Sequence, residues 1–148
     1  MLDALLAYGG LLFGALLAAT ILPASSEAAL AGLLATGAYE PAALLAVATV
    51  GNTAGAAINW LLGRCLLHLQ HRRWFPLKPS QFARSRSWFQ RYGAWTLLFS
   101  WVPVVGDPLT VAAGALRMRF WPFLAIVFVG KAARYVLVGG VTLWWMAA

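Results

Sequence analysis

The chain consists mainly of long apolar runs, and short polar groups with proline or glycine separate or interrupt them. The runs 41–65 and 120–147 continue far enough to cross ~30 Å of hydrocarbon as helices that rise ~1.5 Å per residue. The run 4–22 could cross alone or form the first limb of a helical hairpin. This pattern predicts an all-α membrane protein.

One apolar run is broken in its middle by Pro103-Val104-Val105-Gly106-Asp107-Pro108. Pro103 lacks a backbone N–H and should end a helix, whereas Asp107 followed by proline is typical of an N-cap and a first helical residue. The flanking segments 95–102 and 108–116 are too short to cross a membrane. They predict a re-entrant hairpin whose tip lines a cavity, because backbone at such a tip needs protein or water around it.

The first half of the chain repeats this arrangement. In each half a proline, Pro23 or Pro103, is followed four positions later by a carboxylate. A second proline, Pro41 or Pro122, then follows 14 or 15 residues after that acid, at the start of a long apolar run. The repetition predicts two inverted repeats, each a re-entrant hairpin followed by a transmembrane helix.

The predicted organisation is one membrane domain, 1–148, with a first repeat at 1–65, a connector at 66–92 and a second repeat at 93–148. Ser25 or Ser26 can cap the short helix that follows the first break. The residues assigned to the two hairpin tips are Pro23, Ser26, Pro103, Gly106 and Pro108.

Composition strengthens the membrane assignment and adds an orientation. The chain is 62% hydrophobic and 10% charged, against roughly 25% charged residues in an average soluble domain. It has 11 Lys and Arg against 4 Asp and Glu, and seven of the basic residues lie between Arg64 and Arg91. Basic residues in short loops mark the cytoplasmic side of a membrane, so this cluster indicates topology rather than nucleic-acid binding. Because Arg64 is the first basic residue, we do not expect a cleaved signal peptide.

The remaining charges fit a topology in which each hairpin returns to the side it entered. Arg117 and Arg119 then share the cytoplasmic side with the connector, and Asp3 and Glu40 lie outside with both termini. If residues 4–22 span separately, the N-terminus is cytoplasmic instead, and this is the competing topology.

Two helical surfaces are expected to make specific contacts. Within 41–65, small residues and amides recur at steps of four and permit close helix packing; they are Gly51, Gly55, Asn59 and Gly63. In the connector, Ser80 can cap a helix whose aromatic residues fall within roughly 120°, with Arg84 and Arg91 opposite. Its aromatic face consists of Phe82, Trp88, Phe89 and Tyr92. Such a basic amphipathic helix is typical of a membrane surface.

The last apolar run contains two cations that are candidates for substrate binding. Lys131 lies near mid-bilayer, and Arg134 and Tyr135 follow one turn later on the same face. A charge at this depth costs ~2.5 kcal/mol or more, so functional use is the default interpretation. Arg134 could instead snorkel to the far interface.

Glu27 and Asp107 are candidates for proton coupling, because paired helix starts at membrane depth are typical of transporter sites. The alternative is that each acid only complements a helix dipole. Asn52 stands near the position that Lys131 holds in the other half, and it is either a substrate contact or a structural amide.

No metal site or cofactor is expected. His68 and His71 are three residues apart, but no third ligand accompanies them and a solvated basic loop explains them better. Cys65 is the single cysteine, so a disulfide framework is excluded. Ser25 and Ser26 have no neighbouring base that would make either a nucleophile.

Several short motifs, taken in order, resemble the DedA family, also called the SNARE-associated or VTT-domain family, and its short YqaA-like branch. They are Glu27 to Gly37, Gly51-Asn52-Thr53-Ala54-Gly55, Arg91-Tyr92-Gly93, Pro103-Val104-Val105-Gly106-Asp107, Ala113-Gly114, Gly130-Lys131 and Arg134-Tyr135. The resemblance implies a multi-pass bacterial inner-membrane protein with two re-entrant hairpins. It also implies lipid transport, of undecaprenyl phosphate or phospholipid, coupled to protons.

One departure from the family pattern affects substrate binding. Better-known members have arginines three residues before and three after the second hairpin's proline, where this chain has Ser100 and Gly106. The headgroup contact credited to those arginines does not transfer. Either Lys131 and Arg134 replace their charge, or the substrate differs.

Together these features predict a flippase or scramblase, not an enzyme, for a phosphate-bearing lipid. Its partners would be membrane lipids and protons, and it would act as a monomer or a homodimer. Lys131, Arg134, Asn52 and Tyr135 would bind substrate, with Glu27 and Asp107 coupling protons. Other hypotheses are a small proton-coupled exporter of cationic compounds, a non-transporting assembly factor and, with least support, an enzyme on lipid phosphates.

Overall fold

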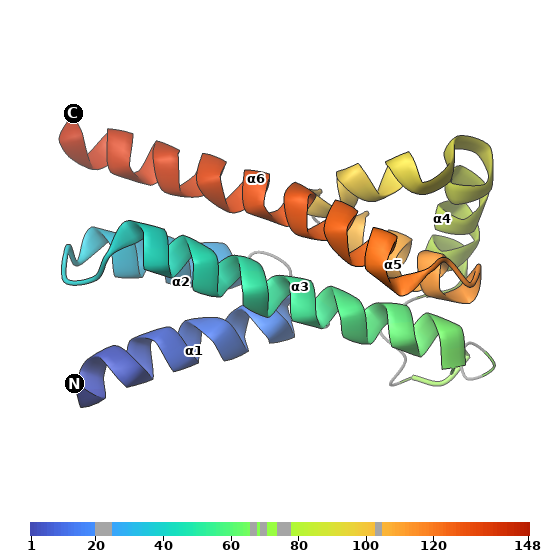
Figure 1. Cartoon of the computed structure of the whole chain (residues 1–148), viewed down its shortest axis with the longest axis horizontal. Coiled ribbons are helices and arrows are strands. Elements are labelled where there is room, and N and C mark those ends of the chain that lie inside the picture. The colour runs from blue at the N-terminus through green and yellow to red at the C-terminus, as the bar shows by residue number, and fades with distance from the viewer. Residues whose placement is uncertain (20–24, 66–67, 69–70, 74–77, 103–104) are drawn as a thin grey trace. The chain divides into compact units, whose positions relative to one another are not determined.

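The computed structural model describes residues 1–19, 25–65, 68, 71–73, 78–102 and 105–148. Helices make up the fold of this described part, which confirms the predicted all-α class (Figure 1). The elements are α1 (Leu2–Ala18), α2 (Ser25–Ala35), α3 (Pro41–Cys65), α4 (Pro79–Tyr92), the 3-10 helix η2 (Gly93–Trp101), α5 (Gly106–Ala115) and α6 (Phe120–Ala147).

The two longest helices have the bounds that the apolar runs predict. In the described part of the chain, α3 and α6 are the helices long and apolar enough to cross a membrane. By contrast, α1 has 17 residues and a length of ~26 Å, which is less than the hydrocarbon thickness. The remainder of the run 4–22 falls largely outside the described residues, so the competing topologies both stay predictions.

Contacts divide the chain into two compact units. Unit 1 comprises residues 1–55 and 131–148, and unit 2 comprises residues 56–130. The first part of α3 and the last part of α6 therefore belong to unit 1, and their other parts belong to unit 2. The predicted division into sequence repeats stays a prediction.

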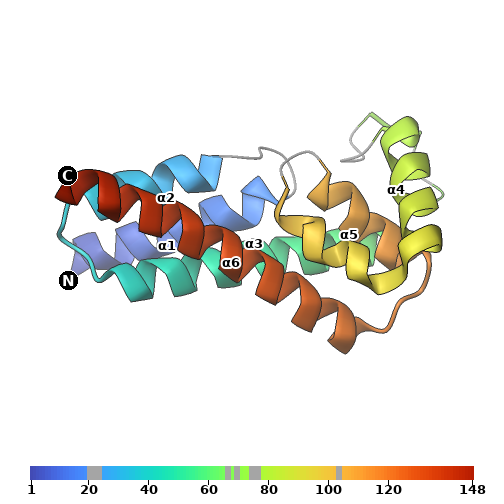
Figure 2. The same ribbon diagram turned by 90° about the horizontal axis from the view of Figure 1, so that it is seen from above.

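Unit 1 contains an antiparallel pair of short helices, α1 and α2, together with its parts of α3 and α6 (Figures 1 and 2). Both termini lie at the same end of this unit in both views. A Cβ atom added at Gly51 would lie 2.5 Å from the carbonyl oxygen of Leu12, so only glycine permits this approach of α1 to α3. The core of the unit consists of Leu11, Leu30, Leu34, Leu44, Ala48 and Tyr135.

Unit 2 contains a second antiparallel pair, η2 and α5, and the amphipathic helix α4 (Figures 1 and 2). In this unit the backbone of α5 is in close contact with the backbone of residues 56–65 of α3. A Cβ atom at Gly63 would lie 2.0 Å from the oxygen of Val111, and one at Gly114 would lie 1.9 Å from the oxygen of Trp60. The predicted small-residue stripe is therefore confirmed at Gly63 as well as at Gly51, while Asn59 is buried in the same helix.

A sharp turn at Gly93 joins α4 to η2. Its φ of 68° and ψ of −156° belong to a region that is essentially restricted to glycine. The turn folds the aromatic face of α4 back onto the protein, and Phe82 packs with Val111 and Ala112 of α5. The predicted amphipathic helix is thus present, with Arg84 and Arg91 exposed as expected.

The predicted helix caps are wrong at two places. Helix α5 starts at Gly106 with Val105 as its N-cap, so Asp107 lies inside the first turn. Pro108 is accommodated there because the first N–H groups of a helix lack intrahelical partners. Helix α4 starts at Pro79, one residue before Ser80, because proline favours the first helical position.

The described part of α2 starts at Ser25, and the residues before it lie outside the described part, so the cap predicted at Ser25 or Ser26 stays a prediction. The hydroxyl of Ser26 bonds to a side chain of α6. Pro23 and Pro103, the predicted breaks, lie outside the described residues. The inverted repeat and the re-entrant course of the hairpins stay predictions.

Candidate functional site

Four buried polar side chains of unit 1 form a continuous hydrogen-bonded chain. Lys131 and Tyr135 belong to α6, Asn52 to α3 and Ser26 to α2. Each is at most 6% exposed. They line up because Lys131 and Tyr135 are four residues apart on one face of a helix. Lys131, Asn52 and Tyr135 are the substrate ligands predicted from the sequence, and the structure brings all three together.

The chemistry of these groups fixes the direction of the hydrogen bonds. The Lys131 ammonium can only donate, and it donates to Oδ1 of Asn52. The amide nitrogen of Asn52 therefore faces the other way and donates to the Tyr135 hydroxyl at 2.8 Å. The Tyr135 O–H can then donate to Oγ of Ser26, 2.9 Å away. Three helices are thus joined through one tyrosine hydroxyl and one amide.

An ion pair lies directly beside this chain. The Arg134 guanidinium bonds to the Glu27 carboxylate through both Nε and Nη2. The side chains are 14% and 24% exposed respectively, so the pair is largely enclosed. This contact disagrees with the alternative in which Arg134 extends to an interface. It also gives Glu27 a partner besides the positive end of the α2 dipole.

The two interactions follow one another along both helices. Ser26 and Glu27 are neighbours in α2, and they bond to Tyr135 and Arg134, which are neighbours in α6. At this cluster unit 1 contributes two cations, Lys131 and Arg134, and one carboxylate, Glu27. The cluster thus places an arginine–carboxylate pair next to a buried lysine, largely enclosed by the protein.

The contact of Ser26 with Tyr135 differs from the sequence prediction, which assigned the serine to capping and to a hairpin tip. Ser26 is 3% exposed, and its hydroxyl lies against that of Tyr135. The sequence contains two complementary neighbour pairs that could have indicated this contact. Ser26-Glu27 in one short helix is a hydroxyl followed by an acid, and Arg134-Tyr135 in the last span is a base followed by a hydroxyl.

The other predicted acid, Asp107, lies in unit 2, in the first turn of α5. Thr110 donates a hydrogen bond to the Asp107 carbonyl oxygen at 2.7 Å and tightens this turn. Both acids therefore occupy the first turn of a short helix, as the internal repeat predicts. Pro108 is buried beside Asp107 in the same turn.

The structure leaves no room for a side chain at one of the two positions where the family resemblance would place an arginine. A Cβ atom at Gly106 would lie 2.1 Å from the Ser100 carbonyl oxygen, so the backbones of α5 and η2 are in contact here. Ser100, the other position, is only 2% exposed.

His68 and His71 are both exposed. Among the residues that the structure describes, no three His, Cys, Asp or Glu side chains lie close enough together to hold a metal ion.

The fold and the site define an all-helical membrane protein with a buried ionic cluster. The family model of the VTT domain matches residues 2–142, nearly the whole chain. The chain therefore belongs to the VTT-domain family, the DedA family of the sequence resemblance.

Similar proteins support this membership. The inner membrane protein YqaA of Escherichia coli is 40% identical over 135 residues, which cover 87% of this chain and 89% of that protein. An uncharacterized protein of Haemophilus influenzae is 36% identical over 132 residues, 82% of this chain and 78% of its own. An alkaline phosphatase-like protein of Lactococcus lactis is 27% identical over 96 residues, 59% of this chain and 45% of its own. No solved structure matches the chain.

Proposed function

We propose that this protein is a bacterial inner-membrane transporter that moves a phosphate-bearing lipid, undecaprenyl phosphate or a phospholipid, across the bilayer and is coupled to protons. The observation that carries the proposal is the enclosed Glu27–Arg134 ion pair next to the buried Lys131. Ionic groups inside a membrane segment are costly, and they are retained mainly where they bind or move charge. The inner-membrane location is supported by the relative YqaA.

The lipid phosphate would bind to Arg134 and Lys131. A guanidinium can bind two phosphate oxygens through two N–H groups, and Arg134 already directs Nε and Nη2 at one oxygen, Oε1, of Glu27. Lys131 adds a second positive charge, and Asn52 and Tyr135 offer hydrogen bonds to the phosphate oxygens. These four residues are the proposed substrate ligands.

Proton coupling follows from competition for Arg134. An ionised Glu27 and a lipid phosphate are both anions that need the same guanidinium, and they repel each other at short range. When Glu27 takes up a proton, its attraction to Arg134 falls and the phosphate can replace it. Loss of the proton restores the carboxylate and expels the phosphate. Asp107 is proposed to act in the same way at the second hairpin.

In this proposal the two short helical pairs enter the membrane as re-entrant hairpins. Their tips would be formed around Ser26 with Pro23, and around Gly106 and Pro108 with Pro103. The short helix α2 of unit 1 would then direct its positive N-terminal end at the lipid phosphate. The protein works as a monomer or a homodimer, and the proposal does not depend on which.

The test is lipid translocation in proteoliposomes. The assay follows exposure of a labelled phosphate headgroup in vesicles containing wild-type protein, Glu27→Gln, Asp107→Asn or Lys131→Met. Lys131→Met should reduce the rate by about tenfold or more, because one charge-assisted hydrogen bond contributes ~1.5–3 kcal/mol. Glu27→Gln and Asp107→Asn should also reduce the rate, because a neutral side chain no longer expels the phosphate. Undiminished translocation by all three variants would disprove the proposal. Arg86→Gln, an exposed charge on α4, is the control.

The same assay separates the rival functions. An exporter of cationic compounds would be hindered by the buried ammonium of Lys131, and its transport would compete with added cationic drugs. A lipid-phosphate enzyme would release inorganic phosphate. An assembly factor would give no translocation in either the wild type or the variants.

A further inference from the structure

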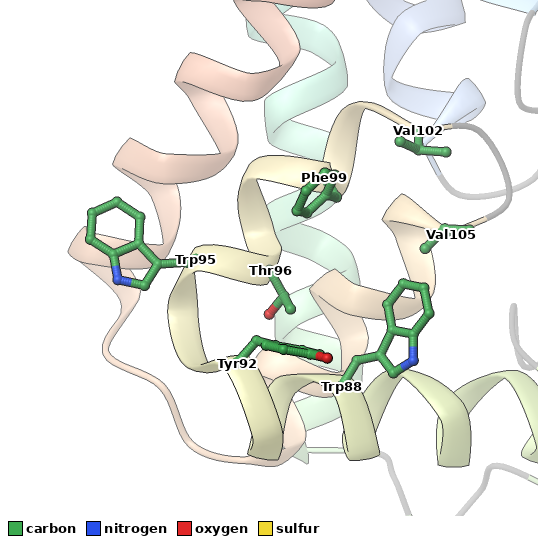
Figure 3. Close-up of a pocket in the computed structure, with 7 residues that line it drawn as sticks. All are labelled: Trp88, Tyr92, Trp95, Thr96, Phe99, Val102 and Val105. Carbon is green, nitrogen blue, oxygen red and sulfur yellow. The ribbon is translucent and has the colours of Figure 1, made fainter.

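A chamber in unit 2 is built almost entirely from aromatic and aliphatic side chains. Its volume is about 690 Å³, within the range of cavities that bind small molecules. Figure 3 shows that α4 and η2 supply most of its walls. The lining residues are Trp88, Tyr92, Trp95, Thr96, Phe99, Val102 and Val105.

The chamber has little to offer a polar ligand. The Thr96 hydroxyl donates to the carbonyl oxygen of Gly93, so its one O–H donor is used within η2. The aromatic walls remain partly open: Trp88 is 43% exposed and Phe99 is 55% exposed. The Gly93 turn, which only glycine adopts readily, brings the two helices into this arrangement. Hydrocarbon is the chemistry that fits such a space.

A second, smaller cavity adjoins the first, and its wall is mostly apolar with a few polar side chains. Its volume is about 150 Å³, and it shares Trp88 and Val105 with the larger chamber. Its other lining residues include Gln81, Arg84 and Ser85, which lie on α4. The apolar chamber thus adjoins a small cavity whose lining residues include an arginine and a glutamine.

The net positive charge of unit 2 favours an anionic ligand. Nine of the 11 Lys and Arg residues lie between residues 56 and 130, and Asp107 is the single acidic residue in that range of the sequence. The sequence of α4 contains no acidic residue at all. A ligand with a negative head and an apolar tail is complementary to both compartments.

We propose that one anionic phospholipid binds here, with an acyl chain in the aromatic chamber and its phosphate at Arg84 and Gln81. This site is distinct from the Glu27–Arg134 cluster of unit 1. It requires that the protein lies in a lipid bilayer but not that it transports lipid, so it extends beyond the proposed function.

The test is photolabelling of the full chain in proteoliposomes. The probes are phosphatidylglycerol and phosphatidylcholine with the same diazirine-bearing acyl chain, and labelled peptides are mapped by mass spectrometry. We expect label to concentrate on residues 88–105 and to be stronger with phosphatidylglycerol. Arg84→Gln should reduce that preference about fivefold, because one basic residue near the membrane surface contributes about that factor.

Three variants make the test specific. Arg86→Gln removes an exposed arginine from the same helix but outside both cavities, so it should keep the preference for the anionic probe. Phe99→Ala should weaken labelling of residues 88–105 by both probes alike. Arg134→Gln should retain the labelling even where it abolishes translocation, so failure of the transport proposal is distinguishable from failure of this one.

Four results would overturn the site. In the first, the two probes label the protein equally; in the second, the Arg84 and Arg86 variants lose the preference for the anionic probe equally. In the third, the label on residues 88–105 is no denser than the label on the exposed faces of α1 and α6. In the fourth, residues 88–105 carry no label in a protein that cross-links as two copies. The last result would assign the chamber to a second copy of the chain.

Discussion

At the scale of single residues, Tyr135 is the side chain on which the polar cluster depends. It is 1% exposed, and its hydroxyl contacts both Asn52 and Ser26. Buried polar groups that lose a partner keep the full cost of their desolvation. The Tyr135 hydroxyl of α6 is therefore the hydrogen-bond partner of one polar side chain in each of two other helices, Asn52 in α3 and Ser26 in α2.

The first prediction is that Tyr135→Phe destabilises the protein although it removes one oxygen atom. Asn52 and Ser26 would each lose a buried hydrogen bond, and we expect a loss of about 1–3 kcal/mol in the free energy of unfolding. Thermal or denaturant unfolding in detergent measures it. Tyr39→Phe, at a partly buried ring that packs edge-on against Tyr8, is the control. Equal stability of the two variants would contradict the hydrogen-bonded chain.

A second prediction concerns the ion pair. Glu27→Gln and Arg134→Gln should each destabilise the protein, whereas the double variant should be less destabilised than the sum. We expect a coupling energy of about 1–3 kcal/mol because each single change leaves an enclosed charge without its partner. A double-mutant cycle in unfolding free energy measures this quantity. Additive effects would show that the pair contributes nothing to the fold.

How far the sequence predicts this site depends on the residue. The sequence indicates Lys131 and Arg134 because charges within an apolar run are rare. It indicates Asn52 because this polar residue stands near the position that Lys131 holds in the other half of the chain. The pairing of Arg134 with Glu27 is not predictable from pattern, because the two residues are 107 positions apart and a helix packing angle decides whether they meet. The Ser26 contact depends on the same packing.

At the scale of helices, glycine determines how closely the elements approach. Gly114 of α5 lies against the carbonyl oxygen of Trp60 in α3, and Gly63 of α3 lies against that of Val111 in α5. Each helix therefore contributes a glycine that contacts the backbone of the other. Without a hydrophobic driving force between helices in lipid, such close packing supplies much of the association energy.

The third prediction tests this contact. Gly114→Ala would place a methyl group 1.9 Å from backbone and should force α5 away from α3, with a loss of about 1–3 kcal/mol in stability. Gly140→Ala, at a position with nothing within 4 Å, should be neutral or slightly stabilising. Unfolding of both variants in the same detergent measures the difference. A tolerated Gly114→Ala would contradict close approach of the two backbones as the reason for glycine.

Element boundaries show what pattern can and cannot determine. The bounds of α3 and α6 follow from uninterrupted apolar length, and that signal is strong. The predicted caps at Ser80 and Asp107 lie two residues after the observed N-caps, Lys78 and Val105. Proline favours the first helical position at Pro79, and the Gln81 side chain accepts a hydrogen bond from the Lys78 N–H. The tight contact of Gly106 with Ser100 has no signal in a single sequence.

At the scale of the whole molecule, the orientation of α3 tests the predicted topology. Cys65, the single cysteine, is exposed at the C-terminal end of α3, and Glu40 is exposed just before its start. We predict that an impermeant maleimide labels Cys65 from the cytoplasmic side alone. Glu40→Cys in a Cys65→Ser background should be labelled from the outside alone. Labelling of both positions from one side would contradict a spanning α3.

The most direct measurement of the central claim is the pH dependence of lipid translocation in proteoliposomes. The claim is that a proton on Glu27 releases Arg134 to a lipid phosphate. Acidification of the loading side should therefore accelerate translocation of a phosphate-bearing lipid by the wild type, and Glu27→Gln should lose that acceleration. A wild-type rate that does not change with pH, or an acceleration that is intact in Glu27→Gln, would contradict the claim.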